Sequence, residues 1–401
     1  MTKVVVIGAG QAAASLVARL RGKGFEGDIT VFGDEPQPPY QRPPLSKAYL
    51  LGDMTLERLF LRPESFYSDN NIDLRTGVRV DSVDRTAKTV TAEGETVPYD
   101  HLVFCTGSEP RRLPAAIGGD LAGVSVVRTL ADVDDMAPRC TKEARVLIVG
   151  GGYIGLEAAA VAAKLGLKVT LVEAAERILQ RVAAPETSSY FRDLHKSHGV
   201  DLREGCGLVK LTGDGHVSGA DLTDGSSLEV DFVIVGVGIT PGSELAEAAG
   251  LALDNGIKTN ALGQTSDPSI WAAGDCASFP SADGQMRLES VGNAVDMAEL
   301  VADNIMGGEG TYTAKPWFWS DQYDVKLQIA GLNSGYDRVV VRDNNGARSH
   351  WYYAGDTLLA VDAMNDPRGY MVGKRLIEAG KSPAPDAVAD PETDLKALLK
   401  A

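Results

Sequence analysis

One pattern of residues occurs twice in this 401-residue chain. Val4 to Ile7 leads into Gly8-Ala9-Gly10-Gln11-Ala12-Ala13, and Val146 to Val149 leads into Gly150-Gly151-Gly152-Tyr153-Ile154-Gly155. Each copy predicts a buried strand, a tight turn and a helix of small residues. The first glycine allows the bend, the second lets a pyrophosphate approach the backbone, and a small third residue lets the helix pack on the strand. We therefore expect two α/β units that each bind a dinucleotide.

Each copy is followed by a second strand and an acidic residue. In the first copy this residue is Asp34 or Glu35, and in the second it is Glu173. A carboxylate at this place accepts hydrogen bonds from the adenosine ribose of a bound dinucleotide. The acidic residues therefore strengthen the dinucleotide interpretation of both glycine-rich turns.

Composition and cysteine spacing argue against several other classes of protein. A formal net charge of -16 argues against a nucleic-acid partner, since phosphate binding relies on clustered lysine and arginine. The chain has no run of eighteen uninterrupted apolar residues, so we expect no membrane-spanning helix. The four cysteines are scattered without metal-ligand spacing, which predicts neither a metal site nor disulfides and favours a cytoplasmic location.

The order of the patterns predicts an α/β protein of three domains. The second dinucleotide unit appears as an insertion in the first, and the chain after Trp317 alternates in the manner of β-strands. We expect a discontinuous first domain (1–111 and 239–315), a second domain (112–238) and a C-terminal α+β domain (316–401). Asp214-Gly215 and Asp224-Gly225 predict hairpin turns. Residues 381–392 are expected to be a surface segment before a short terminal helix.

The chain resembles a known superfamily along essentially its whole length. The most specific stretches are Tyr40–Lys47, Cys105–Arg111, Thr265–Asp275 and Trp317–Tyr323. They are similar to the flavoprotein disulfide-reductase superfamily, and within it to ferredoxin reductases of the putidaredoxin-reductase and rhodocoxin-reductase type. Those enzymes transfer electrons from NADH to 2Fe-2S proteins that serve haem monooxygenases and aromatic-ring dioxygenases.

The resemblance assigns FAD to the first site. It implies that Gly8, Gly10 and Ala12 hold the pyrophosphate, that Asp34 or Glu35 binds the ribose, and that Asp275 accepts bonds from the ribityl or pyrophosphate region. Other positions that match flavin-binding residues are Arg42, Lys47, Val80, Thr106, Gly107, Arg128, Val291 and Trp319.

The resemblance assigns the nicotinamide nucleotide to the second site. A carboxylate at Glu173 repels a 2'-phosphate, which favours NADH over NADPH. Arg177 and Arg181 leave NADPH open, because a flexible guanidinium could meet that phosphate. The residues assigned to this nucleotide are Gly150, Gly152, Ile154, Gly155, Glu173, Arg181, Gly236, Gly238 and Glu289.

Three residues are the predicted catalytic group. Lys47 beside the flavin would favour the reduced, electron-rich ring, because a fixed opposite charge stabilises developing charge in a pocket of low dielectric. By family position Glu157 pairs with Lys47 and offsets its charge, and Trp319 lies near the flavin ring. For docking a 2Fe-2S protein, Arg287, Lys374 and Arg375 are candidate cations.

The expected reaction depends on the absence of a redox-active cysteine pair from the first site. No cysteine occurs between Asp34 and Leu51, where the disulfide reductases of this superfamily carry a redox pair. Electrons that arrive as a hydride must therefore leave without a thiol, and a flavin can pass them on singly. We predict an FAD-dependent NADH:ferredoxin reductase. A rubredoxin reductase and an NADH-sensing flavoprotein of the apoptosis-inducing type are the alternatives.

Overall fold

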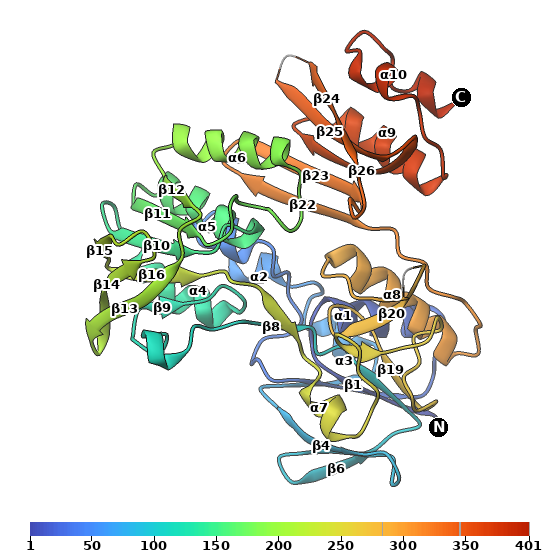
Figure 1. Ribbon diagram of the computed structural model, residues 1–401. Coiled ribbons are helices and arrows are strands. Elements are labelled where there is room, and N and C mark those ends of the chain that lie inside the picture. Colours follow the sequence, from blue (N-terminus) through green and yellow to red (C-terminus); the bar gives the residue numbers. More distant parts are fainter. Residues whose placement is uncertain (283, 345, 401) are drawn as a thin grey trace. The chain divides into compact units, whose positions relative to one another are not determined.

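The computed structural model describes residues 1–282, 284–344 and 346–400. The chain folds into two compact units. The first unit comprises Met1–Arg42, Thr55–Glu109 and Ile239–Pro316, and the second comprises Pro43–Met54, Pro110–Gly238 and Trp317–Ala401. Each unit contains one five-stranded parallel sheet, and the second also carries the C-terminal antiparallel sheet (Figure 1). This arrangement confirms the predicted fold class of two Rossmann-like folds with a C-terminal α+β region.

The parallel sheet of the first unit has the order β19-β7-β1-β2-β3. Its strands are β1 (Lys3–Ile7), β2 (Asp28–Gly33), β3 (Ile72–Thr76), β7 (His101–Phe104) and β19 (Ile270–Ala272). Strand β19 pairs in parallel with β7, although the whole second dinucleotide fold intervenes in the sequence. The second fold is therefore inserted into the first, as the sequence predicts.

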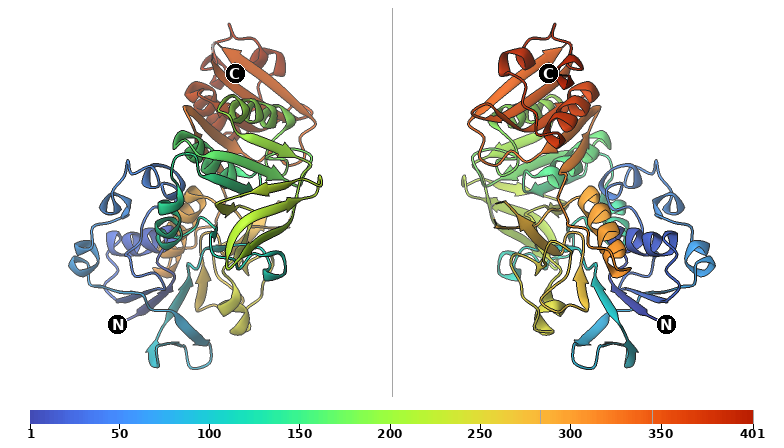
Figure 2. Two further views of the ribbon diagram at one scale, coloured as in Figure 1. Left: turned by 90° about the vertical axis from the view of Figure 1, so that its left-hand side faces the viewer. Right: turned by 90° about the vertical axis from the view of Figure 1, so that its right-hand side faces the viewer.

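Helix α1 (Gln11–Gly22) packs beside α8 (Val291–Ile305), and Figure 2 shows the two as neighbouring blue and orange coils. The small and apolar side chains of α1 are buried, and Arg19 binds both carboxylate oxygens of Asp303 at 2.8 and 2.7 Å. The remaining elements of this unit are α2 (Leu56–Leu59), α3 (Ser65–Asp69), β4 (Val80–Asp84), β5 (Thr89–Ala92), β6 (Glu95–Pro98), β8 (Ser108–Pro110, ending at the boundary), β17 (Ile239–Pro241), α7 (Glu244–Ala248), β18 (Ile257–Lys258), β20 (Ala277–Ser281) and β21 (Gly284–Met286).

The parallel sheet of the second unit has the order β12-β11-β10-β16-β9. Its strands are β9 (Val124–Ser125), β10 (Arg145–Val149), β11 (Lys168–Glu173), β12 (Asp201–Glu204) and β16 (Phe232–Val235), and its helices are α4 (Leu130–Met136), α5 (Tyr153–Lys164) and α6 (Pro185–Ser197). The antiparallel strands β13 (Leu208–Asp214), β14 (His216–Leu222) and β15 (Ser227–Glu229) turn at Gly215 and Gly225, where φ is +71° and +84°. Both predicted hairpins are therefore confirmed.

The C-terminal sheet is antiparallel in the order β22-β23-β26-β25-β24. Its strands are β22 (Trp317–Gln322), β23 (Val325–Gly331), β24 (Arg338–Asn344), β25 (Ala347–Ala354) and β26 (Thr357–Met364). Helix α9 (Pro367–Glu378) covers this sheet with an apolar face. Asp366 caps its start, because its carboxylate accepts from the Gly369 amide at 2.8 Å.

Residues 381–392 lie mostly at the surface, as the sequence predicts. Residues 381–392 contain α10 (Pro385–Ala389), and Val388 within it is fully buried. The buried Arg342 guanidinium donates to the carbonyls of Val388, Asp390, Pro391 and Thr393 at 2.5–3.0 Å. This distant arginine satisfies the backbone of a proline-rich surface segment and so anchors it to the C-terminal sheet. The expected terminal helix is a single 3₁₀ turn at Ala397–Leu399.

A buried polar cluster joins α6 to the C-terminal sheet. Thr187 donates to the Asp362 carboxylate at 2.8 Å, and the Tyr352 hydroxyl also donates to it. His350 Nδ1 lies 2.7 Å from Thr187 Oγ1, and Arg348 donates to His350 Nε2. Burial raises the pKa of Asp362 to about 6 and lowers the pKa of His350 to about 3.

This cluster predicts a pH-dependent stability difference. Because the folded-state pKa of Asp362 lies above its unfolded value, its contribution is complete below pH 4 and is lost as the pH rises through about 6. Relative to the native protein, Asp362→Asn should therefore gain about 2 kcal/mol between about pH 4 and about pH 7. Chemical denaturation at both pH values measures this difference.

The matched control is Asp356→Asn, because that side chain is fully exposed on the turn between β25 and β26. It should show no such change. A stability difference between Asp362→Asn and the native protein that does not vary with pH would contradict the assignment.

Candidate functional site

The first glycine-rich turn lies at the carboxyl edge of the first sheet. Gly8 has φ +104°, and a Cβ built there would lie 2.2 Å from the Cys105 carbonyl oxygen, so only glycine fits. A Cβ at Gly10 meets no atom within 4 Å, and no side chain caps α1, which begins after it. The open space beside an uncapped helix start is what a pyrophosphate needs. The residues present therefore fit the FAD that the sequence predicts.

Loops after β7 and β19 reach the same edge, because the carboxyl ends of parallel strands lie together. Thr106 donates to the Gly242 carbonyl at 2.5 Å, and Gly107 adopts φ +66°. Gly274 lies against Ala12, and Ser108 donates to the Asp275 carboxylate at 3.3 Å. The structure thus gathers most of the predicted FAD residues of this unit around one turn. Val80 is buried at the start of β4, and Val291 is the first residue of α8.

The two acidic alternatives of the first unit have different surroundings. Asp34 is exposed. Glu35 is half-buried and accepts from Arg42 Nη2 and the Tyr40 hydroxyl, both at 2.5 Å. Only Glu35 is thus held in a fixed position by its neighbours. Arg42, which the sequence predicts as a flavin residue, is held by the same contact.

The second turn repeats the geometry of the first. Gly150 has φ +110°, and a Cβ there would lie 2.3 Å from the Gly236 carbonyl oxygen. A Cβ at Gly152 meets nothing within 4 Å, and no side chain caps α5. At Gly155 a Cβ would lie 2.0 Å from the Gly150 oxygen, so the third position of this motif must be glycine. This turn fits a second dinucleotide.

Glu173 is fixed beside this turn. Its carboxylate accepts from the Gly151 amide at 2.7 Å and from the Ala175 amide at 2.8 Å. Arg177 donates to the Ala183 carbonyl and the Ser188 hydroxyl, which directs its guanidinium into the protein. Arg181 is exposed and lies 3.9 Å from a Cβ built on Gly238. Ile154 is 45% exposed on the first turn of α5.

The three predicted catalytic residues lie together within the second unit. The π-helical turn Leu45–Tyr49 is kinked at Lys47, whose ammonium lies 2.9 Å from Glu157 Oε1 and 5.9 Å from the centre of the Trp319 ring. Glu157 is 3% exposed, and burial raises the pKa of its carboxyl while the Lys47 charge lowers it. Trp319 stacks on Trp317 with ring centres 5.5 Å apart.

Sequence reasoning missed three residues of this group. Ser46 donates to Glu157 Oε2 at 3.2 Å, and Ser320 donates to Oε1 at 2.7 Å. Asp321 Oδ2 lies 3.9 Å from the Lys47 ammonium. All three lie inside sequence stretches that carry the family resemblance, and this position was the one signal in the sequence that could have indicated them. The hydrogen bonds satisfy a carboxylate whose burial otherwise costs several kcal/mol.

Other predicted residues have more peripheral surroundings. The backbone amide of Arg128 donates to Asp132 at the start of α4. Glu289, predicted for the nicotinamide nucleotide, belongs to the first unit, where it pairs with Arg287 at 2.6 Å. The Arg287 side chain is only 9% exposed, so this arginine is unsuited to a docking surface, whereas Arg375 is exposed and Lys374 is partly exposed and pairs with Glu378.

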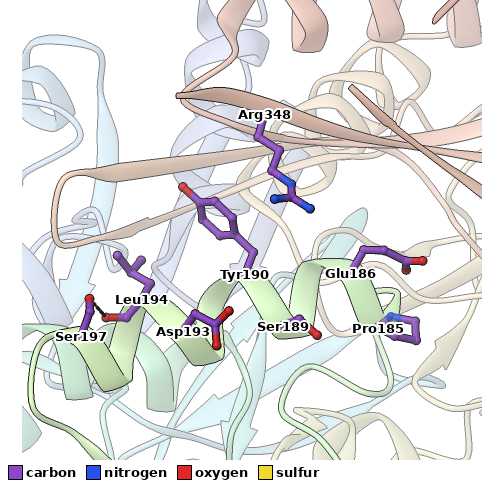
Figure 3. Close-up of a pocket in the computed structure, with 8 residues that line it drawn as sticks. All are labelled: Pro185, Glu186, Ser189, Tyr190, Asp193, Leu194, Ser197 and Arg348. Carbon is purple, nitrogen blue, oxygen red and sulfur yellow. Dashed lines mark hydrogen bonds between the residues drawn. The ribbon is translucent and has the colours of Figure 1, made fainter. Parts of the chain in front are cut away.

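The hollow in Figure 3 contains no predicted site residue. It lies between α6 and β25, and the Arg348 guanidinium points toward Tyr190 there, 6.0 Å from the ring centre. No group of three or more metal-ligating side chains occurs in the described ranges. Among the same residues, no helix has the length and apolar character needed to span a membrane.

Two dinucleotide turns and a buried lysine–glutamate pair define a flavin- and nicotinamide-dependent oxidoreductase class. The pyridine nucleotide-disulphide oxidoreductase family matches residues 2–298, and the reductase C-terminal family matches residues 317–399. The chain belongs to the pyridine nucleotide-disulphide oxidoreductase family. Membership confirms the predicted resemblance and the predicted cofactors, FAD and a nicotinamide nucleotide.

Individual relatives are similar along the whole chain. A ferredoxin–NAD(P)+ reductase from Sphingomonas sp. is 44% identical, with 99% of this chain and 97% of that protein aligned. Putidaredoxin reductase from Pseudomonas putida is 41% identical over 99% of this chain and 97% of its own length. The solved covalent putidaredoxin reductase–putidaredoxin complex matches with a TM-score of 0.96 and 40% identity, covering 100% of this chain and 98% of that chain.

Gly10 and Gly22, at the two ends of α1, predict different outcomes. Gly10→Ala should leave the fold intact, since its φ of -103° suits alanine and the methyl group meets no protein atom. The methyl group would instead occupy the space for the pyrophosphate, so FAD affinity should fall at least about tenfold, a loss of ~1.4 kcal/mol. Flavin fluorescence titration of the apoprotein measures this affinity.

Gly22→Ala is the matched control, because it also meets no atom within 4 Å but lies at the far end of α1. It should bind FAD normally. Equal FAD affinity in Gly10→Ala and Gly22→Ala would show that Gly10 does not face the cofactor.

Proposed function

We propose that this protein is an NADH-dependent ferredoxin reductase that supplies electrons to an oxygenase system. Two electrons arrive from NADH as a hydride, and two molecules of a 2Fe-2S protein each accept one, with release of one proton. When bound, FAD supplies the ability to accept electrons as a pair and release them singly. The observation that carries the proposal is full-length similarity to ferredoxin reductases, including putidaredoxin reductase.

The chain's own residues have distinct proposed roles. The turn that contains Gly8, Gly10 and Ala12 holds the FAD pyrophosphate; Gly8 allows the bend, and its own amide donates to the Phe32 carbonyl at 2.8 Å. Glu35, rather than the exposed Asp34, accepts from the ribose. Lys47 supplies a fixed positive charge to the electron-rich flavin, and Glu157 offsets this charge. The Trp319 ring centre lies 5.9 Å from the Lys47 ammonium, and Trp319 is proposed to face the flavin ring.

The remaining FAD assignments are secondary. Asp275 and the Thr106-Gly107 turn are proposed to accept and donate hydrogen bonds around the pyrophosphate and ribityl region, beside Val80 and Val291. Arg42 positions Glu35, and Arg128 is proposed to contact the flavin.

The nicotinamide nucleotide is proposed to bind at Gly150, Gly152, Ile154 and Gly155. Glu173 favours NADH, because its carboxylate is fixed at the place where a 2'-phosphate would be repelled. Arg177 is engaged with the protein, which weakens the NADPH alternative. Arg181, Gly236, Gly238 and Glu289 remain proposed contacts of this nucleotide.

Thiol chemistry does not suit the four cysteines. All are unpaired, and only Cys140 is partly exposed. Burial raises the pKa of Cys140 to about 11 and raises the pKa values of Cys105 and Cys276, so these thiols stay protonated and weakly nucleophilic at neutral pH. Unpaired thiols also accord with a cytoplasmic location, which is part of the proposed function.

The proposed function is divided among three domains. The first comprises residues 1–111 and 239–315, the second residues 112–238, and the third residues 316–401.

A rubredoxin reductase is the second candidate, because a rubredoxin-NAD(+) reductase from Pseudomonas putida is 36% identical over 91% of this chain. Stopped-flow absorbance separates the two functions. FAD-loaded protein reduced with NADH should be reoxidised rapidly by a 2Fe-2S protein and at least about tenfold more slowly by rubredoxin. NADPH should reduce the flavin at least about tenfold more slowly than NADH.

Two results would contradict the proposal. One is a flavin that NADH does not reduce. The other is reduced flavin that persists as a complex with NAD+ when a 2Fe-2S protein is added, since that behaviour indicates an NADH-sensing protein.

A further inference from the structure

A chain of buried hydrogen bonds extends from the Lys47–Glu157 pair into the C-terminal sheet and α6. Ser320 donates to Glu157 at 2.7 Å, and Gln322 Nε2 donates to Ser320 Oγ at 3.1 Å. On its other side, Gln322 Oε1 lies 2.8 Å from His195 Nε2. Ser320, Gln322 and His195 are all fully buried. Their polar groups therefore interact with one another rather than with water.

Every hydrogen bond in this series is donated toward Glu157, because the charge of Glu157 sets the direction. An ionised carboxylate only accepts hydrogen bonds, so the single hydroxyl proton of Ser320 points to Glu157. Ser320 Oγ must then accept from the amide NH₂ of Gln322, which turns the Gln322 carbonyl toward His195. His195 Nε2 must carry the ring proton, which leaves Nδ1 to accept from the Tyr323 hydroxyl at 3.0 Å.

The outer end of the chain supports this direction. Burial lowers the pKa of His195 to about 4, so the ring is neutral at pH 7 and has one donor and one acceptor nitrogen. The Tyr323 ring stacks on His198 with ring centres 3.7 Å apart. Ser320, Gln322 and His195 each have a partner on both sides, and together these partners fix which atoms donate and which accept.

We propose that Gln322 and His195 are positioning residues of the Lys47–Glu157 pair, acting through Ser320. By keeping the Ser320 hydroxyl directed at Glu157, they keep this carboxylate charged and Lys47 in place beside it. The groups that face Glu157 directly are Lys47 and Ser46 from the kinked turn and Ser320 from β22. The effect on electron transfer rests on the proposed function, whereas the effect on Glu157 does not.

The test is an infrared titration of the Glu157 carboxyl band in apoprotein and FAD-loaded protein, with Glu157→Gln identifying the band. In Gln322→Met, the acid dissociation constant of Glu157 should fall about tenfold, because Ser320 loses the donor that fixes the position of its hydroxyl proton. Ser320→Ala should lower it at least as much, and Ser320→Thr, which keeps the hydroxyl, should preserve it. In loaded protein the flavin midpoint potential should rise in Gln322→Met and Ser320→Ala, because less negative charge offsets Lys47.

Ser349→Ala is the matched control. Ser349 is equally buried in the same sheet, but its hydroxyl binds Asp366 and Trp351 instead. It should change neither the Glu157 ionisation nor the midpoint potential. If Gln322→Met does not fold, His195→Leu interrupts the chain one step further out and should act in the same direction.

Unchanged Glu157 ionisation in Gln322→Met, or in His195→Leu where that replaces it, would overturn the inference. A shift of the same size in Ser349→Ala would also overturn it, because the effect would then be general to the sheet. The apoprotein titration needs no turnover, so these outcomes are separate from a failure of the wild-type protein to reduce a 2Fe-2S protein.

Discussion

One buried carboxylate makes three distant segments of the second unit depend on each other. Glu157 lies on α5, Lys47 and Ser46 on the kinked turn Leu45–Tyr49, and Ser320 on β22. Removing a carboxylate from water costs several kcal/mol unless charge and hydrogen bonds replace the lost solvation. The kinked turn and β22 must therefore meet at α5. The helix that follows the second glycine-rich turn thus also positions the charged pair proposed to act on the flavin.

The two glycine-rich turns provide the corresponding constraint on the backbone. In each turn the first glycine is forced by a neighbouring carbonyl, and the second opens onto empty space at a helix start. The first glycine therefore serves the fold and the second serves the ligand. This division explains why one short pattern can specify both an α/β architecture and a dinucleotide site.

Local patterns explain what the sequence could predict. The glycine turns, the hairpins at Gly215 and Gly225 and the insertion of the second fold depend on neighbouring residues or on strand order. The fixed position of Glu35, on which its proposed role at the ribose rests, could not be predicted, because it depends on how Tyr40 and Arg42 fold back onto Glu35.

Contacts between residues far apart in the sequence also could not be predicted, because they depend on how the chain folds. Arg342 anchors a segment some fifty residues further along the chain, and no pattern within that segment indicates this contact. The partner of Glu157 on β22, Ser320, lies 163 residues away, and family position could supply only the pair with Lys47. Such contacts arise from tertiary packing, which no local pattern encodes.

The flavin alone is proposed to carry the electrons in this protein, although its family is named for disulphide chemistry. The most direct test is an anaerobic NADH titration of FAD-loaded protein, both native and with all four cysteines replaced by serine. One NADH per FAD should bleach the flavin completely in both proteins, and both should reduce a 2Fe-2S protein at the same rate. A second equivalent of NADH taken up only by the native protein, or loss of electron transfer in a folded variant that retains FAD, would contradict the account.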